Sequence, residues 1–160
     1  MAEIRKDSNG ITMSYAGRYN LKNPKKYMGV GTNPMYKSRL ELIVFNKLDI
    51  DEKILRWGYE IIQIPYFCKI DNKIHKYKVD IYCESKNETG IIRSLIEIKS
   101  SEEVRPIKKP TLMNPRSRQR YKESVRSHIV NESKWRAAVD FCKKSNIKMM
   151  ILTEKDIEKL

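Results

Sequence analysis

The chain has 160 residues, of which 33 are Lys or Arg and 20 are Asp or Glu, so its formal net charge is +13 near neutral pH. This length allows one domain with a real core and is too short for two ordinary domains. The excess of cations is larger than solubility requires and favours a polyanionic partner such as DNA. No apolar run approaches the ~20 residues of a membrane span, and residues 1–7 lack the apolar centre of a signal peptide. We therefore expect a cytosolic protein without a membrane partner or a small-molecule substrate.

The cysteines and histidines do not indicate a metal or disulfide framework. Cys68, Cys83 and Cys142 are odd in number and far apart in the sequence, so we expect buried free thiols. His75 and His128 are the only histidines, and neither has a cysteine or second histidine at the usual spacing of zinc ligands. A zinc site and a histidine-based nuclease are therefore not expected.

A short N-terminal tail is followed by a segment that lacks acidic residues. Residues 1–13 are predicted to form a flexible tail, and residues 14–160 a single domain. From Tyr15 to Arg39 there are four tyrosines and six basic residues but no acid. This mixture suits a segment that lies along a phosphate backbone, and the alternative is a solvated loop anchored by its tyrosines. The candidate DNA-binding residues here are Arg18, Lys22, Lys25, Lys26, Lys37 and Arg39.

The elements that follow alternate between helical and strand patterns. A helix is predicted from near Tyr36, with Leu40, Ile43, Val44 and Leu48 on one apolar face. Three strands rich in β-branched and aromatic residues come next, at about 59–67, 74–84 and 91–100.

A second basic segment covers residues 105–122, with seven cations, three prolines and no acid. These features predict an extended basic loop over about residues 101–130. Its candidate DNA-binding residues are Arg105, Lys108, Lys109, Arg116, Arg118, Arg120 and Lys122.

The last third of the chain is predicted to contain a helix, a strand and a short terminal helix. The helix covers about residues 133–144, is capped by Ser133 or Asn131, and carries one apolar stripe. That stripe consists of Trp135, Ala138, Val139 and Cys142. Residues 147–152 read as a buried strand, and residues 153–156 resemble a capping box. The whole chain then has the order helix, three strands, helix, strand, an α/β arrangement with helices on both faces of a mixed sheet.

Two of the strands carry a candidate catalytic set. Glu97 and Lys99 share one strand face, and a hairpin between the second and third strands brings Asp80 beside Glu97. Two carboxylates suit Mg²⁺, with Mn²⁺ as a substitute, and the lysine suits a phosphate or a metal-bound water. We expect Asp80, Glu97 and the backbone carbonyl of Ile98 to ligate the metal, and Lys99 to orient the attacking water.

Two further polar residues lie near this set in the predicted fold. Glu41 offers a third carboxylate for the metal, and the alternative is a surface residue paired with Lys37. Gln63 interrupts an apolar strand, where it either orients a water or phosphate or satisfies a buried backbone group.

The segments Val79-Asp80 and Glu97-Ile98-Lys99 resemble the PD-(D/E)xK pattern of metal-dependent nucleases, with valine in place of the usual proline. The order of the elements matches the αβββαβ core of the restriction-endonuclease-like fold.

The chain from about residue 14 to 157 also resembles the head completion nucleases of T-even-type tailed bacteriophages. The segments that carry this likeness include Ser14–Tyr19, Tyr36–Glu41, Ile64–Cys68, Val79–Tyr82, Ile96–Lys99 and Lys134–Ala138. The resemblance implies a DNA nuclease of late phage assembly that acts on the packaged DNA end so that a filled head can accept a tail. It also implies phage head, portal or neck proteins as partners, in the cytoplasm of the infected host or in the virion.

Two other functions fit the same residues. One is a non-catalytic DNA-binding plug or adaptor of the head that retains a nuclease fold. The other is a nuclease that cleaves transposon ends or resolves junctions.

Overall fold

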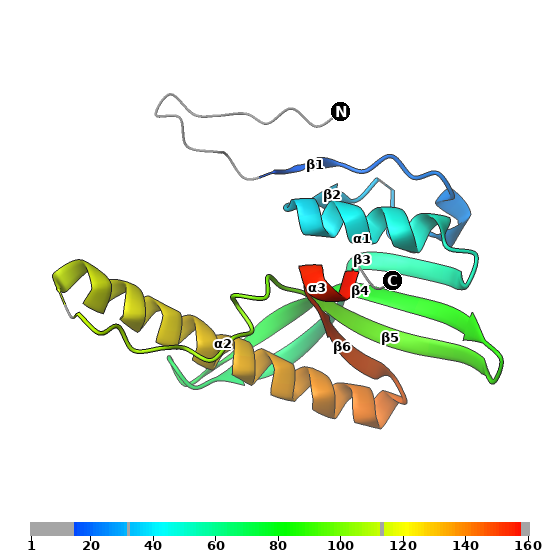
Figure 1. The fold of residues 1–160 in the computed structure, drawn as a ribbon. Coiled ribbons are helices and arrows are strands. Elements are labelled where there is room, and N and C mark those ends of the chain that lie inside the picture. Colours follow the sequence, from blue (N-terminus) through cyan, green and yellow to red (C-terminus); the bar gives the residue numbers. More distant parts are fainter. Residues whose placement is uncertain (1–14, 32, 113, 158–160) are drawn as a thin grey trace.

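A computed structural model describes residues 15–31, 33–112 and 114–157, so the predicted tail at residues 1–13 lies outside the described residues. Its main sheet has the strand order β3-β4-β5-β6 (Figure 1). The strands are β3 (Ile54–Cys68), β4 (Lys73–Asn87), β5 (Gly90–Ile98) and β6 (Lys148–Leu152). Neighbours among β3, β4 and β5 are antiparallel, and β6 pairs with β5 in parallel. The first of these strands begins at Ile54, earlier than the predicted residue 59.

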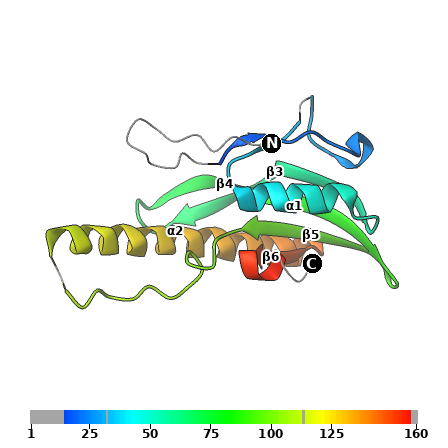
Figure 2. The same ribbon diagram turned by 45° about the horizontal axis from the view of Figure 1, so that its top comes forward.

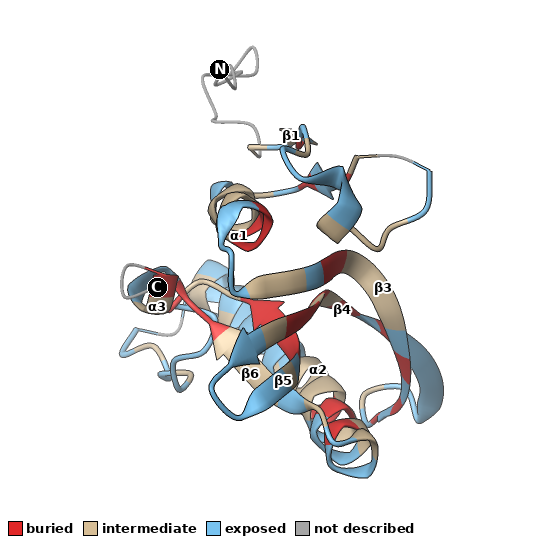
Figure 3. Ribbon diagram, turned by 90° about the vertical axis from the view of Figure 1, so that its right-hand side faces the viewer, coloured by how far each residue is buried: buried red, intermediate tan, exposed pale blue. Residues whose placement is uncertain are grey.

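Helices cover both faces of this sheet (Figures 1 and 2). They are α1 (Arg39–Ile50) on one face and α2 (Pro115–Ser145) on the other. Under α1, Phe45 packs with Trp57 and Ile81, whereas under α2, Ala138 packs with Leu95. Buried residues occur on both helices and along the strands between them (Figure 3), and they form one core cluster under each helix. The predicted α/β class, with helices on both sides of a mixed sheet, is confirmed.

The N-terminal segment is tied to the outer side of α1. Its elements are β1 (Gly17–Arg18), η1 (Pro24–Lys26) and β2 (Met35–Tyr36), and β1 pairs with β2. Asp49 is fully buried in α1 and accepts hydrogen bonds from the Tyr19 hydroxyl at 3.0 Å and the Lys22 amide at 2.7 Å. Tyr19 and Tyr36 are buried in the core, so these tyrosines anchor the segment and do not offer rings for stacking on bases.

The largest difference from the sequence prediction concerns α2. It begins at Pro115, where Asn114 caps it by accepting a hydrogen bond from the Ser117 amide at 2.8 Å. Residues 115–130 are thus helical, and the predicted extended loop is wrong for this part because proline is compatible with the first turn of a helix. Ser133 is not a cap; its hydroxyl donates to the Ile129 carbonyl within the helix at 2.9 Å. Val139, predicted on the buried stripe, is 38% exposed.

The two halves of α2 differ in what they contact. Its buried residues, Ser133, Ala138 and Cys142, all lie in the second half. The first half extends past the sheet, as Figure 1 shows. The part of a helix that projects from the core does not need a continuous apolar stripe. The apolar periodicity of the sequence therefore predicted only the second half of α2, which packs on the sheet.

The C-terminal elements follow the prediction except in burial. β6 is the edge strand of the sheet and only its Leu152 is buried, so the expected fully buried strand is wrong. Thr153 caps α3 (Glu154–Ile157), because the Asp156 carboxylate accepts from the Thr153 amide at 2.9 Å and hydroxyl at 2.7 Å. The predicted short helix is confirmed, and the bond from the Thr153 amide to the Asp156 carboxylate is one half of the predicted capping box.

All three cysteines are free and buried, as predicted. None of the helices in the described ranges is both long enough and apolar enough to cross a bilayer.

Candidate active site

Asp80 lies where β4 and β5 separate. Backbone pairing between these strands runs from Asn87–Gly90 to Ile81–Ile96 and stops there, while β4 continues to pair with β3. The Asp80 carboxylate accepts a hydrogen bond from the Ile98 amide at 2.8 Å. A side-chain hydrogen bond thus replaces the backbone ladder at the fork and fixes the carboxylate against β5.

A β-bulge in β3 faces Asp80. The register between β3 and β4 shifts between Tyr59 and Ile62, and Glu60 in the bulge has a φ of 52°. A bulge places two residues opposite one and bends its strand, a feature that often lies beside active sites. On β4 the packing changes at the same place, since Val79 packs under α2 and Ile81 under α1. The sheet therefore twists and opens at Asp80.

The surroundings of Asp80 disfavour the ionised form of its carboxyl group. Burial and the negative charge of Glu97 raise its pKa to about 7, although the Ile98 amide and the Lys99 ammonium oppose this rise. Two carboxylates that share a partly desolvated site need a compensating cation to be ionised together.

Glu97 is held by two partners. Its side chain is 4% exposed, and its Oε2 accepts a hydrogen bond from the Tyr77 hydroxyl at 2.5 Å. The Lys99 Nζ lies 3.3 Å from Glu97 Oε1 and 3.9 Å from Glu103 Oε1. Burial by itself would lower the pKa of Lys99, but the charges of the nearby carboxylates more than offset this and raise it. Lys99 is therefore a protonated, half-buried cation.

Glu41 lies in the first turn of α1, which Ser38 caps, and adds negative charge to the site. The Ser38 hydroxyl accepts from the Glu41 amide at 3.1 Å, and the Glu41 carboxylate accepts from the Lys37 amide. This is a form of the reciprocal capping arrangement. The Lys37 ammonium contacts Glu60 at 2.5 Å rather than Glu41. The negative charge of Glu41 contributes to the raised pKa of Asp80, so Glu41 faces the site as well as the helix end.

Gln63 lies on the far side of the bulge from Asp80. It is exposed and stands opposite Lys78 in the register of β3 and β4. Its side chain makes no hydrogen bond to the site carboxylates among the described residues, and its role in orienting a water stays a prediction.

The donor set fits a divalent metal. Asp80 and Glu97 carry carboxylates on neighbouring strands and Glu41 carries one on α1, although the oxygens of all three do not lie within 4.8 Å of one another. The Ile98 carbonyl stands between Glu97 and Lys99 in the chain. Hard oxygen donors are the ligands that Mg²⁺ and Mn²⁺ prefer. The raised pKa of Asp80 also favours a metal site, because a bound cation would supply the positive charge that the paired carboxylates lack.

Two aromatic residues of the site were not predicted from the sequence. Tyr77 binds Glu97 from a position twenty residues earlier in the chain. Tyr59 is buried near Glu41, Glu60 and Asp80, and burial followed by these negative charges raises its pKa. Only the register of the strands reveals either contact, since neither tyrosine belongs to the catalytic pattern.

The N-terminal cations are largely engaged in structural contacts. The Lys22 ammonium donates to the Asn46 side chain at 2.8 Å, and that of Lys26 to the Asp51 carbonyl at 2.8 Å. Lys37 is paired with Glu60. The exposed cations Arg18, Lys25 and Arg39 have no such side-chain partner within the described ranges.

The second basic segment borders a groove beside the site. The chain from residue 100 to 110 and the first half of α2 enclose two adjoining hollows of about 300 and 1000 Å³. Lys108 and Arg120 line both, Arg116 lines the smaller and Arg105 the larger. The larger hollow also reaches Glu103, which contacts Lys99. The larger hollow is also lined by the acidic residues Glu102, Glu103 and Glu123, so its cations alternate with carboxylates. Lys109, Arg118 and Lys122 lie outside both hollows.

Comparison with known proteins shows the family of the chain. Residues 51–154 match the family model described as "TnsA-like endonuclease N terminal", so the chain belongs to this endonuclease family. It is also 34% identical over 148 residues to the head completion nuclease of Enterobacteria phage T4. That similarity covers 92% of this chain and 97% of the phage protein.

Proposed function

We propose that the protein hydrolyses DNA phosphodiester bonds with a divalent metal held by Asp80 and Glu97. The observation that carries the proposal is the meeting of Asp80, Glu97 and Lys99 at the fork between β4 and β5. Membership of an endonuclease family supports the same reaction class.

Each residue has a defined part in this proposal. Asp80 and Glu97, with the Ile98 carbonyl, would hold the metal, and Glu41 would complete its surroundings or serve a second ion. When bound, Mg²⁺ or Mn²⁺ would activate a water and offset charge on the phosphate. Lys99 orients the attacking water and stabilises negative charge that develops on the phosphoryl oxygens. Tyr77 fixes the orientation of Glu97, and the amide of Ile98 fixes that of Asp80.

The basic groove would position the duplex. Phosphate contacts from Arg105, Lys108, Arg116 and Arg120 give affinity and orientation without reading the base sequence. Because the larger hollow ends near Glu103 and Lys99, a DNA strand that follows it arrives at the carboxylates. The exposed N-terminal cations would contact the flanking DNA.

The biological step follows from similarity to the phage relative. The T4 protein is a head completion nuclease, and we infer that this chain acts on packaged DNA ends in late phage assembly. Docking to head, portal or neck proteins, in the host cytoplasm or in the virion, belongs to this inference.

Incubation of supercoiled and linear DNA with the protein separates an enzyme from a DNA-binding plug. Nicked or linear products with Mg²⁺, and intact DNA with EDTA, are expected. Binding without cleavage under both conditions would support the plug. Cleavage confined to branched DNA or to one specific end sequence would instead support the junction-resolving or transposon-end alternative.

A further inference from the structure

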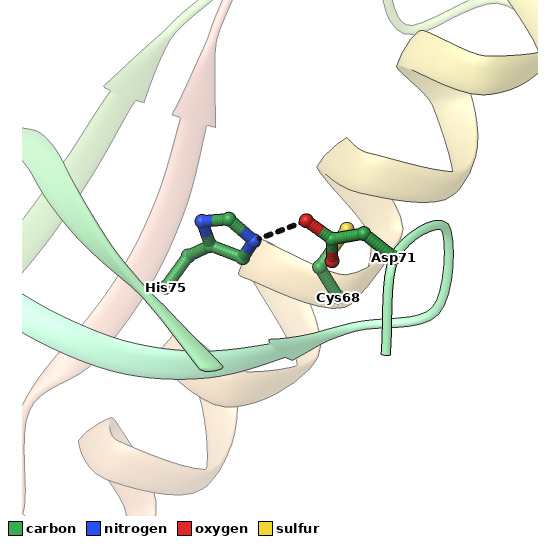
Figure 4. A group of neighbouring side chains, drawn as sticks. All are labelled: Cys68, Asp71 and His75. Atoms are coloured by element: carbon green, nitrogen blue, oxygen red, sulfur yellow. Dashed lines mark hydrogen bonds and ion pairs between the residues drawn. The ribbon is translucent and has the colours of Figure 1, made fainter. Parts of the chain in front are cut away.

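The tip of the β3–β4 hairpin brings together three side chains whose spacing in the sequence does not match the usual spacing of zinc ligands. Cys68 ends β3, Asp71 lies in the turn and His75 lies near the start of β4. One potential ligand atom from each lies within 4.8 Å of the other two (Figure 4). The His75 Nε2 is 2.8 Å from Asp71 Oδ2.

The hairpin holds this cluster in place. Cys68 stands opposite Lys73 in the register, and Asn72 between them has a φ of 55°, which turns the chain sharply. The Asp71 carboxylate accepts from the Lys73 amide at 3.3 Å, and the His75 ring stacks near Tyr66 at a centroid distance of 5.7 Å. The turn and its neighbouring residues therefore hold the three side chains in place, in addition to the contacts among the three.

The two sides of the cluster differ in exposure. Cys68 is 4% exposed and packs into the core cluster under α2, whereas Asp71 and His75 are exposed. A metal ion can therefore approach from solvent, with the thiol as its inner ligand and a water completing its coordination.

We propose that Cys68, Asp71 and His75 form a binding site for Zn²⁺ or a transition metal of similar preference. Thiolate, imidazole and carboxylate are the usual zinc ligands, and three protein ligands with an open fourth position are a known type of site. This donor set differs from the all-oxygen set at Asp80 and Glu97, so the two sites select different metals.

The metal would act on the outer hairpin and not on the nuclease centre. His75 is five residues from Asp80, about 16 Å along an extended strand. Beyond Asp80 the ribbon of β3 and β4 has no pairing with β5. A metal that joins the end of β3, the turn and the start of β4 would stabilise this two-stranded ribbon. The competing interpretation is a metal-free cluster, in which the Asp71 carboxylate pairs with His75 and accepts a hydrogen bond from the Cys68 thiol.

Titration of Co²⁺ into the untagged, reduced protein tests the site, because a thiolate ligand gives a charge-transfer absorption band that an oxygen site cannot give. We expect this band to saturate at one equivalent and to disappear when Zn²⁺ is added. It should be lost in Cys68→Ser, and Co²⁺ binding followed by this band should be at least tenfold weaker in His75→Gln. Zn²⁺ should also raise the melting temperature of the wild type more than that of His75→Gln.

The chain offers matched controls. Cys83→Ser, Cys142→Ser and His128→Gln change the same residue types elsewhere and should keep the band. His75 is exposed, so His75→Gln remains folded and informative even where Cys68→Ser does not fold. Absence of a charge-transfer band at millimolar Co²⁺, a band that persists in Cys68→Ser, or unchanged affinity in His75→Gln would overturn the proposal.

Discussion

The carboxylate of Asp80 accepts a hydrogen bond from the backbone amide of Ile98 at 2.8 Å, at the point where β4 and β5 stop pairing. This bond joins the two strands across the fork and holds Asp80 beside Glu97, the neighbour of Ile98. The candidate site is therefore built into the branching of the sheet and does not depend on a mobile loop.

The raised pKa of Asp80 predicts how stability changes with pH in the absence of metal. The folded-state pKa, about 7, lies above the ordinary value of 3.8, so ionisation of Asp80 destabilises the fold progressively as pH rises from about 4 to 7. Asp80→Asn removes this ionisation and should be more stable than the wild type at pH 8. A pKa shift of this size corresponds to about 4 kcal/mol, so the melting temperature of the variant should rise by roughly 10 °C.

Thermal unfolding in EDTA at pH 4, 6 and 8 measures this effect. The difference between variant and wild type should shrink toward pH 4, because Asp80 is protonated in the folded state and is only about half ionised in the unfolded state at that pH. A difference that does not change with pH would show that Asp80 ionises without cost in the folded protein.

Tyr77→Phe should reduce cleavage through the orientation of Glu97. The variant keeps the ring but loses the hydroxyl that donates to Glu97. Loss of a partner that orients a ligand typically costs about 10- to 100-fold in activity or metal affinity, and we expect a cleavage rate in that range. Tyr82→Phe is the matched control, since it removes a comparable hydrogen bond to Glu84 on the same strand. Equal cleavage rates in the two variants would show that the Tyr77 hydroxyl has no specific role in catalysis.

Lys99→Ala should slow cleavage while metal binding is kept. Removing a preorganised cation near the reacting phosphate should cost on the order of 100-fold in rate. Metal affinity should stay the same or rise, because a positive charge 3.3 Å from Glu97 is removed. Calorimetric titration of Ca²⁺ into the wild type, Lys99→Ala and the exposed control Lys78→Ala measures this. A large loss of affinity in Lys99→Ala alone would make the lysine a structural partner of Glu97.

Cations inside the groove should matter more for DNA than cations outside it. Arg116 and Arg120 line the hollows, whereas Arg118 and Lys122 lie on the same helix but outside them. Replacing the first pair with alanine should reduce the slope of log affinity against log salt by about 2, at roughly 0.9 for each lost phosphate contact. The second pair should change the slope less.

Fluorescence anisotropy with two unrelated duplexes, with Ca²⁺ in place of Mg²⁺, measures both slopes. Both sequences should give the same change, because phosphate contacts carry no sequence information. A larger effect of Arg118 and Lys122 would place the DNA on another side of α2.

The sequence predicted the parts of the site that depend on strand periodicity. Glu97 and Lys99 alternate with Ile96 and Ile98, and a hairpin between β4 and β5 is sufficient to bring Asp80 near them. The sequence pattern could not predict the contacts that depend on the exact placement of neighbouring strands. Tyr77 reaches Glu97 across the fork, where β4 and β5 no longer pair, and Cys68 approaches His75 through the turn between β3 and β4.

The basic segments were harder to predict, since cations carry little information about structure. The first half of α2 has no fully buried residue, and its half-buried Tyr121, Val125 and Ile129 stand among many cations. Three prolines nearby favoured a loop. The N-terminal tyrosines had two interpretations, and the burial of Tyr19 and Tyr36 favours anchoring in the core.

The central claim is that Asp80 and Glu97 act together as metal ligands for DNA hydrolysis. Single-turnover cleavage of supercoiled DNA in Mg²⁺ by Asp80→Asn and Glu97→Gln tests it most directly, with Glu84→Gln as the control. Glu84 is a buried carboxylate on the same strand as Asp80, but it pairs with Arg56 away from the site. We expect each site variant to lose about a thousandfold or more in rate, and the folded control to stay near the wild-type rate. Near wild-type cleavage by either site variant, or an equal loss in the folded control, would contradict the account.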